Sequence, residues 1–216
     1  MLGAYTPLGP IDFFAIMSVP SLSLSSRSMP KKIDKKHLKL LQSIRLLILD
    51  VDGVLTDGKL YYAGEGEVLR SFFVGDGLGI RLLMEAGVEV AIISGRSAKL
   101  VEARCNDLGI KYLYQGALNK KEALEDLLGI LQIAPAHVAF MGDDIIDIPI
   151  LTRVGFAAAP HNAHPDVLAY THWQSKYRGG EGAVRELTDM ILQAQNQLTS
   201  IYQRLEAEGN IYRNPS

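Results

Sequence analysis

Short apolar runs alternate with amphipathic segments along the chain from about residue 37 onward. The apolar runs predict buried strands, and the segments with apolar residues three and four positions apart predict helices. The predicted strands cover 45–50, 88–93, 112–114, 138–141 and 156–159. The predicted helices cover 77–86, 97–108, 119–131, 147–153 and 182–208.

Strands alternating with helices are typical of a parallel sheet covered on both faces. The sequence therefore predicts a Rossmann-like α/β domain over residues 37–195, followed by a helix end and tail over 196–216. Residues 59–62 and 68–74 flank the turn-rich letters "AGEGE" and predict a short β-hairpin within this domain.

Residues 1–36 differ from the remainder of the chain, since they hold several prolines, a serine-rich tract and then a lysine run. We expect a poorly ordered extension there. A signal peptide is disfavoured because no Lys or Arg precedes Arg27.

The composition indicates an ordinary globular protein, with 216 residues of which 48% are hydrophobic. The 22 basic and 24 acidic residues give a net charge of −2, so the basic excess of a nucleic-acid-binding protein is missing from the sequence. No apolar run reaches the roughly 18 residues that span a membrane. The single Cys105 fits a reducing compartment.

Polar clusters follow three of the predicted strands, at Asp50 and Asp52, at Ser94, and at Asp143. Because the carboxyl ends of parallel strands meet at one edge of a sheet, these side chains are expected to converge there. Two adjacent carboxylates repel each other unless a proton or cation lies between them, and Mg²⁺ prefers such hard oxygen ligands. The strand geometry favours Asp143 as a further ligand.

Other readings of these residues remain open at this point. Asp144 and Asp147 are the alternatives to Asp143 as ligands, and Ser94 has the alternative role of a helix N-cap. Lys120 lies in the first turn of a predicted helix, where the helix dipole disfavours a cation. That position suggests a functional role for its ammonium group.

The motifs "DVDGVLTDG", "ISGR", the lysine of "NKKE" and "GDDIID" resemble, in order and spacing, those of the haloacid dehalogenase-like phosphatases. Within that superfamily the chain is most similar to the 3-deoxy-D-manno-octulosonate 8-phosphate (KDO 8-phosphate) phosphatases. The stretches "DGLGIRLL", "YQGALNKKEAL" and "GGEGAVRELTDMIL" contribute to this resemblance, which covers roughly residues 40–195.

The resemblance implies a role for each motif residue. Asp50 is the nucleophile and a Mg²⁺ ligand, and Asp52 is the general acid/base, with its backbone carbonyl also on the metal. Asp143 is the remaining protein ligand, while Ser94 and Lys120 hold the transferring phosphoryl group.

The resemblance also implies a set of substrate contacts, among which the arginines suit carboxylate and phosphate groups. The implied contacts are Asp52, Phe73, Val74, Gly75, Asp76, Gly77, Arg81, Arg96, Arg104 and Lys120. Arg104 has the alternative role of a solvated residue on a helix face. Gly75 departs from the family, because many members carry an arginine at that position.

Only about 40 residues separate Asp52 from Ser94, so a short hairpin stands where many relatives insert a cap domain that excludes water. The family implies a homotetramer in which hairpins pack together and each site is covered by a neighbour. The apolar letters "LYY" and "SFF" fit such packing. Packing of these segments on their own sheet is the alternative.

The predicted function is Mg²⁺-dependent hydrolysis of KDO 8-phosphate through a phospho-aspartate, a cytoplasmic step of lipopolysaccharide biosynthesis. One alternative is a phosphatase for a related nine-carbon acid sugar phosphate or for a broader range of phosphosugars. Another, of a different class, is a receiver-type signalling module, although Asp52 argues against it because a second acid hastens hydrolysis. The last is an inactive homologue that serves as a scaffold.

Overall fold

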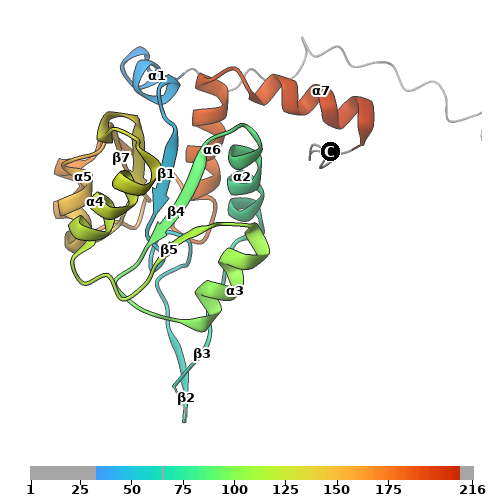
Figure 1. Ribbon diagram of the computed structural model, residues 1–216. Helices are drawn as coiled ribbons and strands as arrows, with labels where there is room; N and C mark the ends of the chain where they lie inside the picture. Colours follow the sequence, from blue (N-terminus) through green and yellow to red (C-terminus); the bar gives the residue numbers. More distant parts are fainter. Residues whose placement is uncertain (1–32, 65, 210–216) are drawn as a thin grey trace, which may run out of the picture. The chain divides into compact units, whose positions relative to one another are not determined.

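A six-stranded sheet with the strand order β5–β4–β1–β6–β7–β8 forms the centre of the fold (Figure 1). Each pairing between neighbouring strands of this sheet is parallel. The strands are β1 (Leu46–Leu49), β4 (Glu89–Ile93), β5 (Tyr112–Tyr114), β6 (Val138–Met141), β7 (Phe156–Ala159) and β8 (Trp173–Gln174). The predicted Rossmann-like α/β class is therefore confirmed.

The computed structural model describes residues 33–64 and 66–209. The predicted N-terminal extension over 1–36 therefore lies almost wholly outside the described residues, and the same holds for the last residues of the predicted C-terminal tail. Within the described part, the first helix already begins at Lys35.

Helices cover both faces of the sheet (Figure 1). The α-helices are α1 (Lys35–Gln42), α2 (Val74–Glu85), α3 (Lys99–Leu108), α4 (Lys120–Leu131), α5 (Ile148–Leu151), α6 (Ala183–Ala194) and α7 (Leu198–Glu208). Alternate residues of β1 divide between two cores: Leu47 and Leu49 pack with α2, α3 and α6, whereas Leu46 and Ile48 pack with α4 and α5. This division follows from the geometry of a strand, in which successive side chains point to opposite faces of the sheet.

The register of the central strands brings their carboxyl ends level. Leu49, the last residue of β1, pairs with Ile92 of β4 on one side and with Met141 of β6 on the other. The residues that follow these three strands therefore emerge side by side, as the sequence predicted. All four residues of β1 are fully buried, which fixes the point where the chain leaves the sheet.

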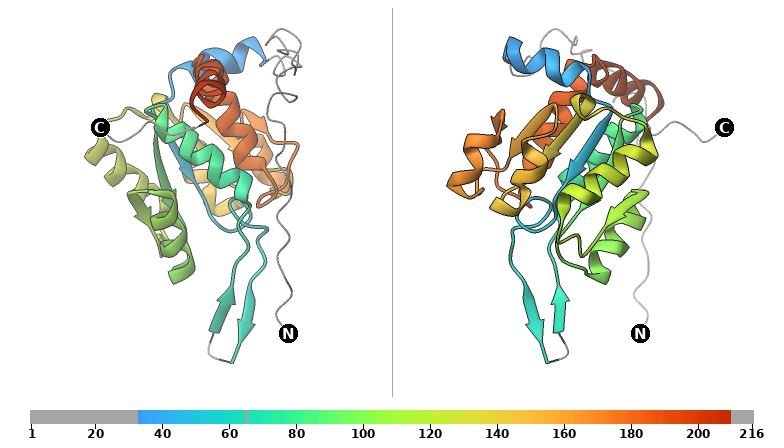
Figure 2. Two further views of the ribbon diagram at one scale, coloured as in Figure 1. Left: turned by 90° about the vertical axis from the view of Figure 1, so that its right-hand side faces the viewer. Right: turned by 60° about the vertical axis from the view of Figure 1, so that its left-hand side comes forward.

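A two-stranded hairpin projects from this edge of the sheet (Figure 2). Its strands are β2 (Tyr61–Ala63) and β3 (Gly66–Leu69), so the predicted hairpin is present. The predicted second strand over 68–74 is too long, because α2 begins at Val74 with Phe73 as its N-cap. Asp76 lies in the first turn of α2, where the helix dipole favours an acid.

The helix predicted over 182–208 is two helices, α6 and α7. Asn196 separates them with a φ of 57°, a left-handed conformation that Asn tolerates better than most side chains. The Gln195 side-chain amide donates to the carbonyl oxygens of Leu41 and Ile44, which fastens this break to the end of α1.

Sequence reasoning missed α1 and the two-residue edge strand β8, and it also missed the 3₁₀-helices Pro135–His137 and Pro165–Tyr170. The Asp34 side chain caps α1 by accepting a hydrogen bond from the backbone N–H of Lys36. Across residues 33–64 and 66–209, the helices are all too short or too polar to traverse a bilayer.

Removing the side chain of Phe140, which is fully buried in β6, should lower the free energy of unfolding. We expect Phe140→Ala to cost about 3–5 kcal/mol, because a cavity is left under α4. The matched change Ile130→Ala, on an exposed residue of α4, should cost less than about 1 kcal/mol. Urea denaturation checks both values, and equal effects would contradict the placement of this core.

Candidate active site

Asp50 is the first residue after β1, a central strand, and it lies at the carboxyl end of the sheet. Its backbone N–H donates to the carbonyl oxygen of Met141 at 3.0 Å, so the strand pairing continues to this residue. Its side chain is buried, and its Oδ1 accepts a hydrogen bond from Lys120 Nζ at 2.8 Å. The same ammonium donates to Asp147 Oδ1 at 2.6 Å.

Three carboxylates converge around this lysine, those of Asp50, Asp143 and Asp147. One oxygen from each lies within 4.8 Å of the others. Burial raises the pKa of Asp50 to about 7, reinforced by the charge of Asp147 and opposed by Lys120. Burial, then the charges of Asp50 and Asp147, raises the pKa of Asp143 to about 8.

The hydrogen bonds of the three acids distinguish Asp143 from Asp147 as a metal ligand. Asp147 is already engaged, since its Oδ1 accepts from Lys120 and its Oδ2 accepts from the backbone N–H groups of Asp143 and Asp144. Asp143 Oδ1, in contrast, is buried and has no hydrogen-bond partner among the described residues. This buried oxygen fits a cation ligand, whereas Asp144 caps a short 3₁₀-helix through Ile145 N–H.

The ligand set fits Mg²⁺, because Asp50 and Asp143 supply hard oxygen atoms at the carboxyl ends of the central strands. Gly53 permits the close approach of Asp143: its φ is 85°, and a Cβ atom there would overlap Asp143 Oδ2. The predicted magnesium cofactor is supported by this arrangement.

Lys120 performs a role other than that of a surface lysine, as its position in the first turn of α4 suggested. Its side chain is buried. Burial alone would lower its pKa, but the charges of Asp50 and Asp147 outweigh that effect and raise it. The ammonium is therefore kept charged at the point where the strands end.

Ser94 follows β4 directly and is buried. Its Oγ accepts a hydrogen bond from the backbone N–H of Arg96 at 3.3 Å. The helix predicted over 97–108 begins at Lys99 with Ala98 as its N-cap, so the alternative role of Ser94 as an N-cap is wrong. Its hydroxyl instead stabilises a loop beside Asp50.

The side chain of Asp52 lies between two arginines. Arg70 Nη1 is 2.8 Å from Asp52 Oδ1, and Arg96 Nε is 3.8 Å from Oδ2. The predicted substrate residue Arg96 therefore does reach the site, and its Nη2 also donates to the hydroxyl of Tyr62 in the hairpin. Sequence reasoning missed Arg70, for which the only signal was a basic residue where the hairpin returns to the sheet.

A second group of predicted residues gathers at the start of α2. Asp76 is buried, and its Oδ1 accepts from the backbone N–H of Arg185 at 2.7 Å, so it caps the start of α6. Arg104 contacts Phe72 and pairs with Asp107, and a Cβ atom on Gly77 would overlap its guanidinium. The side chains of Phe73 and Val74 are exposed.

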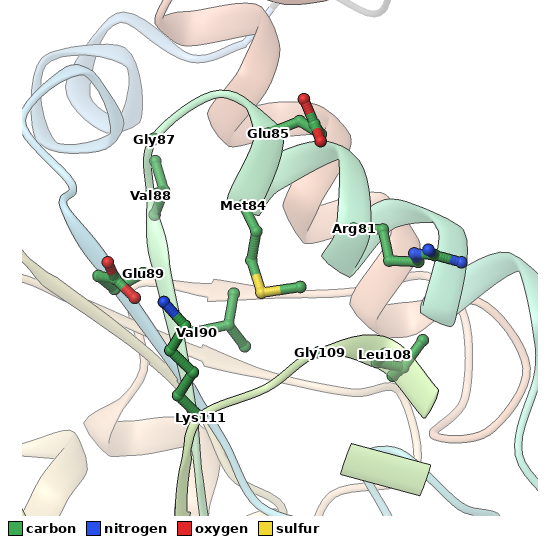
Figure 3. A pocket seen from close by; sticks show the side chains of 10 residues that line it. All are labelled: Arg81, Met84, Glu85, Gly87, Val88, Glu89, Val90, Leu108, Gly109 and Lys111. Carbon is green, nitrogen blue, oxygen red and sulfur yellow. The ribbon is translucent and has the colours of Figure 1, made fainter. Parts of the chain in front are cut away.

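Arg81 lies at the opposite end of the sheet from Asp50. It lines a cavity of about 320 Å³ beside the starts of β4 and β5. Figure 3 shows Arg81 and Met84 on α2, with Val90 on β4 and Lys111 just before β5. A single chain thus does not bring Arg81 to the acids. Its predicted role as a substrate contact, like those of Asp76 and Arg104, stays a prediction.

Asn162 braces the backbone that follows Asp52, and sequence reasoning gave no indication of it. Its Nδ2 donates to the carbonyl oxygen of Gly53 at 3.1 Å, while its Oδ1 accepts from the backbone N–H of Gly179 at 2.6 Å. Gly180 N–H donates to the carbonyl oxygen of Val54 at 3.0 Å. The glycine loop before α6 therefore packs directly on the loop of the two aspartates.

Comparisons with known proteins agree with this geometry. Residues 109–187 match the sequence profile of the haloacid dehalogenase-like hydrolase family. The chain is 52% identical over 157 residues to 3-deoxy-D-manno-octulosonate 8-phosphate phosphatase KdsC of Escherichia coli K12, an alignment that covers 73% of this chain and 84% of that protein.

Solved structures agree as well. The crystal structure of the 3-deoxy-D-manno-octulosonate 8-phosphate phosphatase from Yersinia pestis is 47% identical, with a TM-score of 0.76 over 77% of this chain and 90% of that one. The enzyme of the same name from Moraxella catarrhalis, solved with magnesium, phosphate and KDO, is 36% identical. Its TM-score is 0.76, over 79% of this chain and 98% of that one.

The chain belongs to the haloacid dehalogenase-like hydrolases and, within them, to the family of KDO 8-phosphate phosphatases. It is a phosphoric monoester hydrolase, as predicted from the four motifs. The receiver module and the inactive scaffold are set aside by this membership together with the intact acid, lysine and serine constellation.

The buried carboxyl group of Asp76 should make stability depend on pH. Burial raises its pKa from 3.8 to about 6. A raised pKa stabilises the folded chain fully below the unfolded value, and this stabilisation is lost as the pH rises through the folded value. Asp76→Asn keeps an acceptor for Arg185 N–H and does not titrate.

We therefore expect the free energy of unfolding of Asp76→Asn, relative to the wild type, to rise by on the order of 2 kcal/mol between about pH 4 and pH 7. Urea denaturation at several pH values measures this difference. Asp166→Asn, on an exposed side chain, controls for the loss of one negative charge. A difference that is independent of pH would contradict the burial of a titrating carboxyl group.

Proposed function

We propose that this protein hydrolyses KDO 8-phosphate to KDO and phosphate through a phospho-aspartate, in a Mg²⁺-dependent reaction. The observation that carries this proposal is the buried carboxylate of Asp50, hydrogen-bonded to Lys120 at the end of the central strand with Asp52 two residues later. The names and ligands of the relatives supply the substrate.

The first half-reaction transfers the phosphoryl group to the enzyme. A carboxylate oxygen of Asp50 forms a bond to phosphorus while the bond from phosphorus to the sugar oxygen breaks. The electron pair of that bond leaves with the sugar oxygen, and the proton of Asp52 neutralises it. Ser94 and Lys120 hold the phosphoryl oxygens by hydrogen bonds and positive charge.

The second half-reaction returns the enzyme to its starting state. Asp52, now ionised, takes a proton from a water molecule, whose oxygen attacks phosphorus and releases Asp50. A Mg²⁺ ion held by Asp50, Asp143 and the backbone carbonyl of Asp52 would supply the positive charge that offsets repulsion between the carboxylate and the phosphate. Arg96 lies beside Asp52, which supports the proposal that it meets an anionic part of the substrate.

The finer choice of substrate depends on the segment 73–77 and on Arg81 and Arg104, which we propose contact the sugar acid in the assembled protein. Gly75 is the position where many family members carry an arginine. A Cβ atom at this position would meet the ring of Phe73, so the present arrangement suits glycine. A related nine-carbon acid sugar phosphate therefore stays the alternative substrate.

We also propose a homotetramer that acts in the cytoplasm, in lipopolysaccharide biosynthesis. The hairpin exposes Tyr61, Tyr62 and Leu69, and Phe73 is exposed where the returning arm joins α2. An isolated hairpin with apolar side chains in water is marginally stable, so a second copy of the chain is the partner that these side chains suit.

Phosphate release from KDO 8-phosphate should require Mg²⁺ and should be lost in EDTA. We expect Asp143→Asn to raise the Mg²⁺ concentration for half-maximal activity by roughly tenfold or more, because it removes a metal ligand. The neighbouring Asp144→Asn also removes one negative charge but alters a helix cap rather than a proposed ligand, so it is the matched control and should change that concentration much less.

The same assay on a nine-carbon acid sugar phosphate and on neutral sugar phosphates tests the substrate. A higher kcat/KM for any of these than for KDO 8-phosphate would contradict the proposed substrate. Equal Mg²⁺ requirements in the Asp143 and Asp144 variants would contradict the ligand assignment.

Light scattering at micromolar concentration should give the mass of a tetramer. Tyr61 and Leu69 are cross-strand neighbours, so Tyr61→Lys with Leu69→Lys should dissociate the assembly by placing charges in the packed hairpins. Ile130→Lys, on the exposed face of α4, is the control and should leave the mass unchanged. A monomeric wild type would refute the proposed assembly.

A further inference from the structure

Arg70 is a buried cation at the point where the hairpin returns to the sheet. It follows β3 directly, and 1% of its side chain is exposed. Its Nη1 lies 2.8 Å from Oδ1 of Asp52. An arginine is seldom buried to this extent unless an anion compensates its charge.

The burial of Arg70 also limits what it can contact. The guanidinium is enclosed by the protein, whereas 24% of the Asp52 side chain is exposed. A substrate can therefore reach Asp52, while the burial of Arg70 shields its guanidinium from the substrate. Arg96 is different, because 47% of its side chain is exposed and it lies 3.8 Å from the other oxygen of Asp52.

The two oxygens of Asp52 are thereby made unequal. Oδ1 forms an ion pair with the buried Arg70 guanidinium at 2.8 Å, whereas Oδ2 lies 3.8 Å from the more exposed Arg96. Oδ1 faces the buried guanidinium, so Oδ2 is the oxygen that is open to a leaving group. Proton transfer to a leaving group requires the donor oxygen to be held in one orientation.

We propose that Arg70 is a positioning residue for Asp52, which holds Oδ1 so that Oδ2 delivers the proton to the leaving oxygen. This inference rests on the proposed acid/base role of Asp52 and assigns Arg70 no contact with substrate. Arg70 thus governs how readily a poor leaving group departs, and it affects a good leaving group much less.

The test is a series of aryl phosphates from phenyl to p-nitrophenyl phosphate, measured with the Mg²⁺-loaded enzyme. These substrates share one shape and lack the sugar acid, and kcat/KM covers the steps up to departure of the leaving group. We expect Arg70→Met to lower kcat/KM about 10²-fold for phenyl phosphate but less than about tenfold for p-nitrophenyl phosphate.

Arg70→Lys, which keeps the positive charge, should recover most of the lost activity on phenyl phosphate. Lys59→Met is the matched control, since it removes an exposed cation from the other arm of the hairpin. The ratio of the two substrates does not depend on the folded fraction of a sample, so partial misfolding of Arg70→Met leaves the test valid.

The variant Asp52→Asn separates failure of this inference from failure of the proposed function. If Asp52→Asn loses activity mainly on phenyl phosphate and Arg70→Met loses it equally on both substrates, the role of Arg70 is refuted and that of Asp52 stands. If Asp52→Asn itself affects both substrates equally, the acid role of Asp52 fails, and the inference fails with it. A selective loss in both variants, without further loss when they are combined, supports it.

Discussion

The structure depends on one electrostatic constraint, the gathering of two buried carboxylates and a third, half-buried one around a single ammonium group. Asp50, Asp143 and Asp147 meet Lys120 at the end of the central strands, and the fully ionised group carries two more negative than positive charges. Burial and mutual repulsion hold the pKa values of Asp50 and Asp143 at about 7 and 8. A divalent cation would balance this excess and leave Asp50 ionised, as the proposed nucleophile must be.

The surrounding fold maintains that constraint. The level ends of β1, β4 and β6 set the spacing of the acids, and Asp147 is fixed by Lys120 and by two backbone N–H groups. Gly53 admits Asp143, and the Asn162 side chain fastens the same loop to the glycine loop before α6. These contacts keep the acids close together despite their repulsion, which makes the site suited to a metal ion and a phosphoryl group.

The sequence predicted what local pattern and strand topology determine. The parallel sheet follows from alternating apolar runs, and Asp50, Ser94, Lys120 and Asp143 follow from strand ends and a helix start. Arg70 was missed because its pairing with Asp52 depends on how the hairpin returns to the sheet, which no local pattern encodes. The break at Asn196 was missed because the residues around it include no glycine or proline, which would have marked the end of a helix. Arg81 lies beside the starts of β4 and β5, at the other end of the strands from the acids, so its predicted contact with the substrate stays a prediction.

The central claim is that the carboxylate of Asp50 forms a bond to phosphorus. The most direct test is to quench the enzyme in acid during turnover of KDO 8-phosphate with Mg²⁺ and to map the bound phosphoryl group by mass spectrometry of peptides. We expect one phosphoryl group on Asp50, with none in Asp50→Asn. A phosphoryl group on Ser94, or turnover with no phosphorylated enzyme at any quench time, would contradict the account.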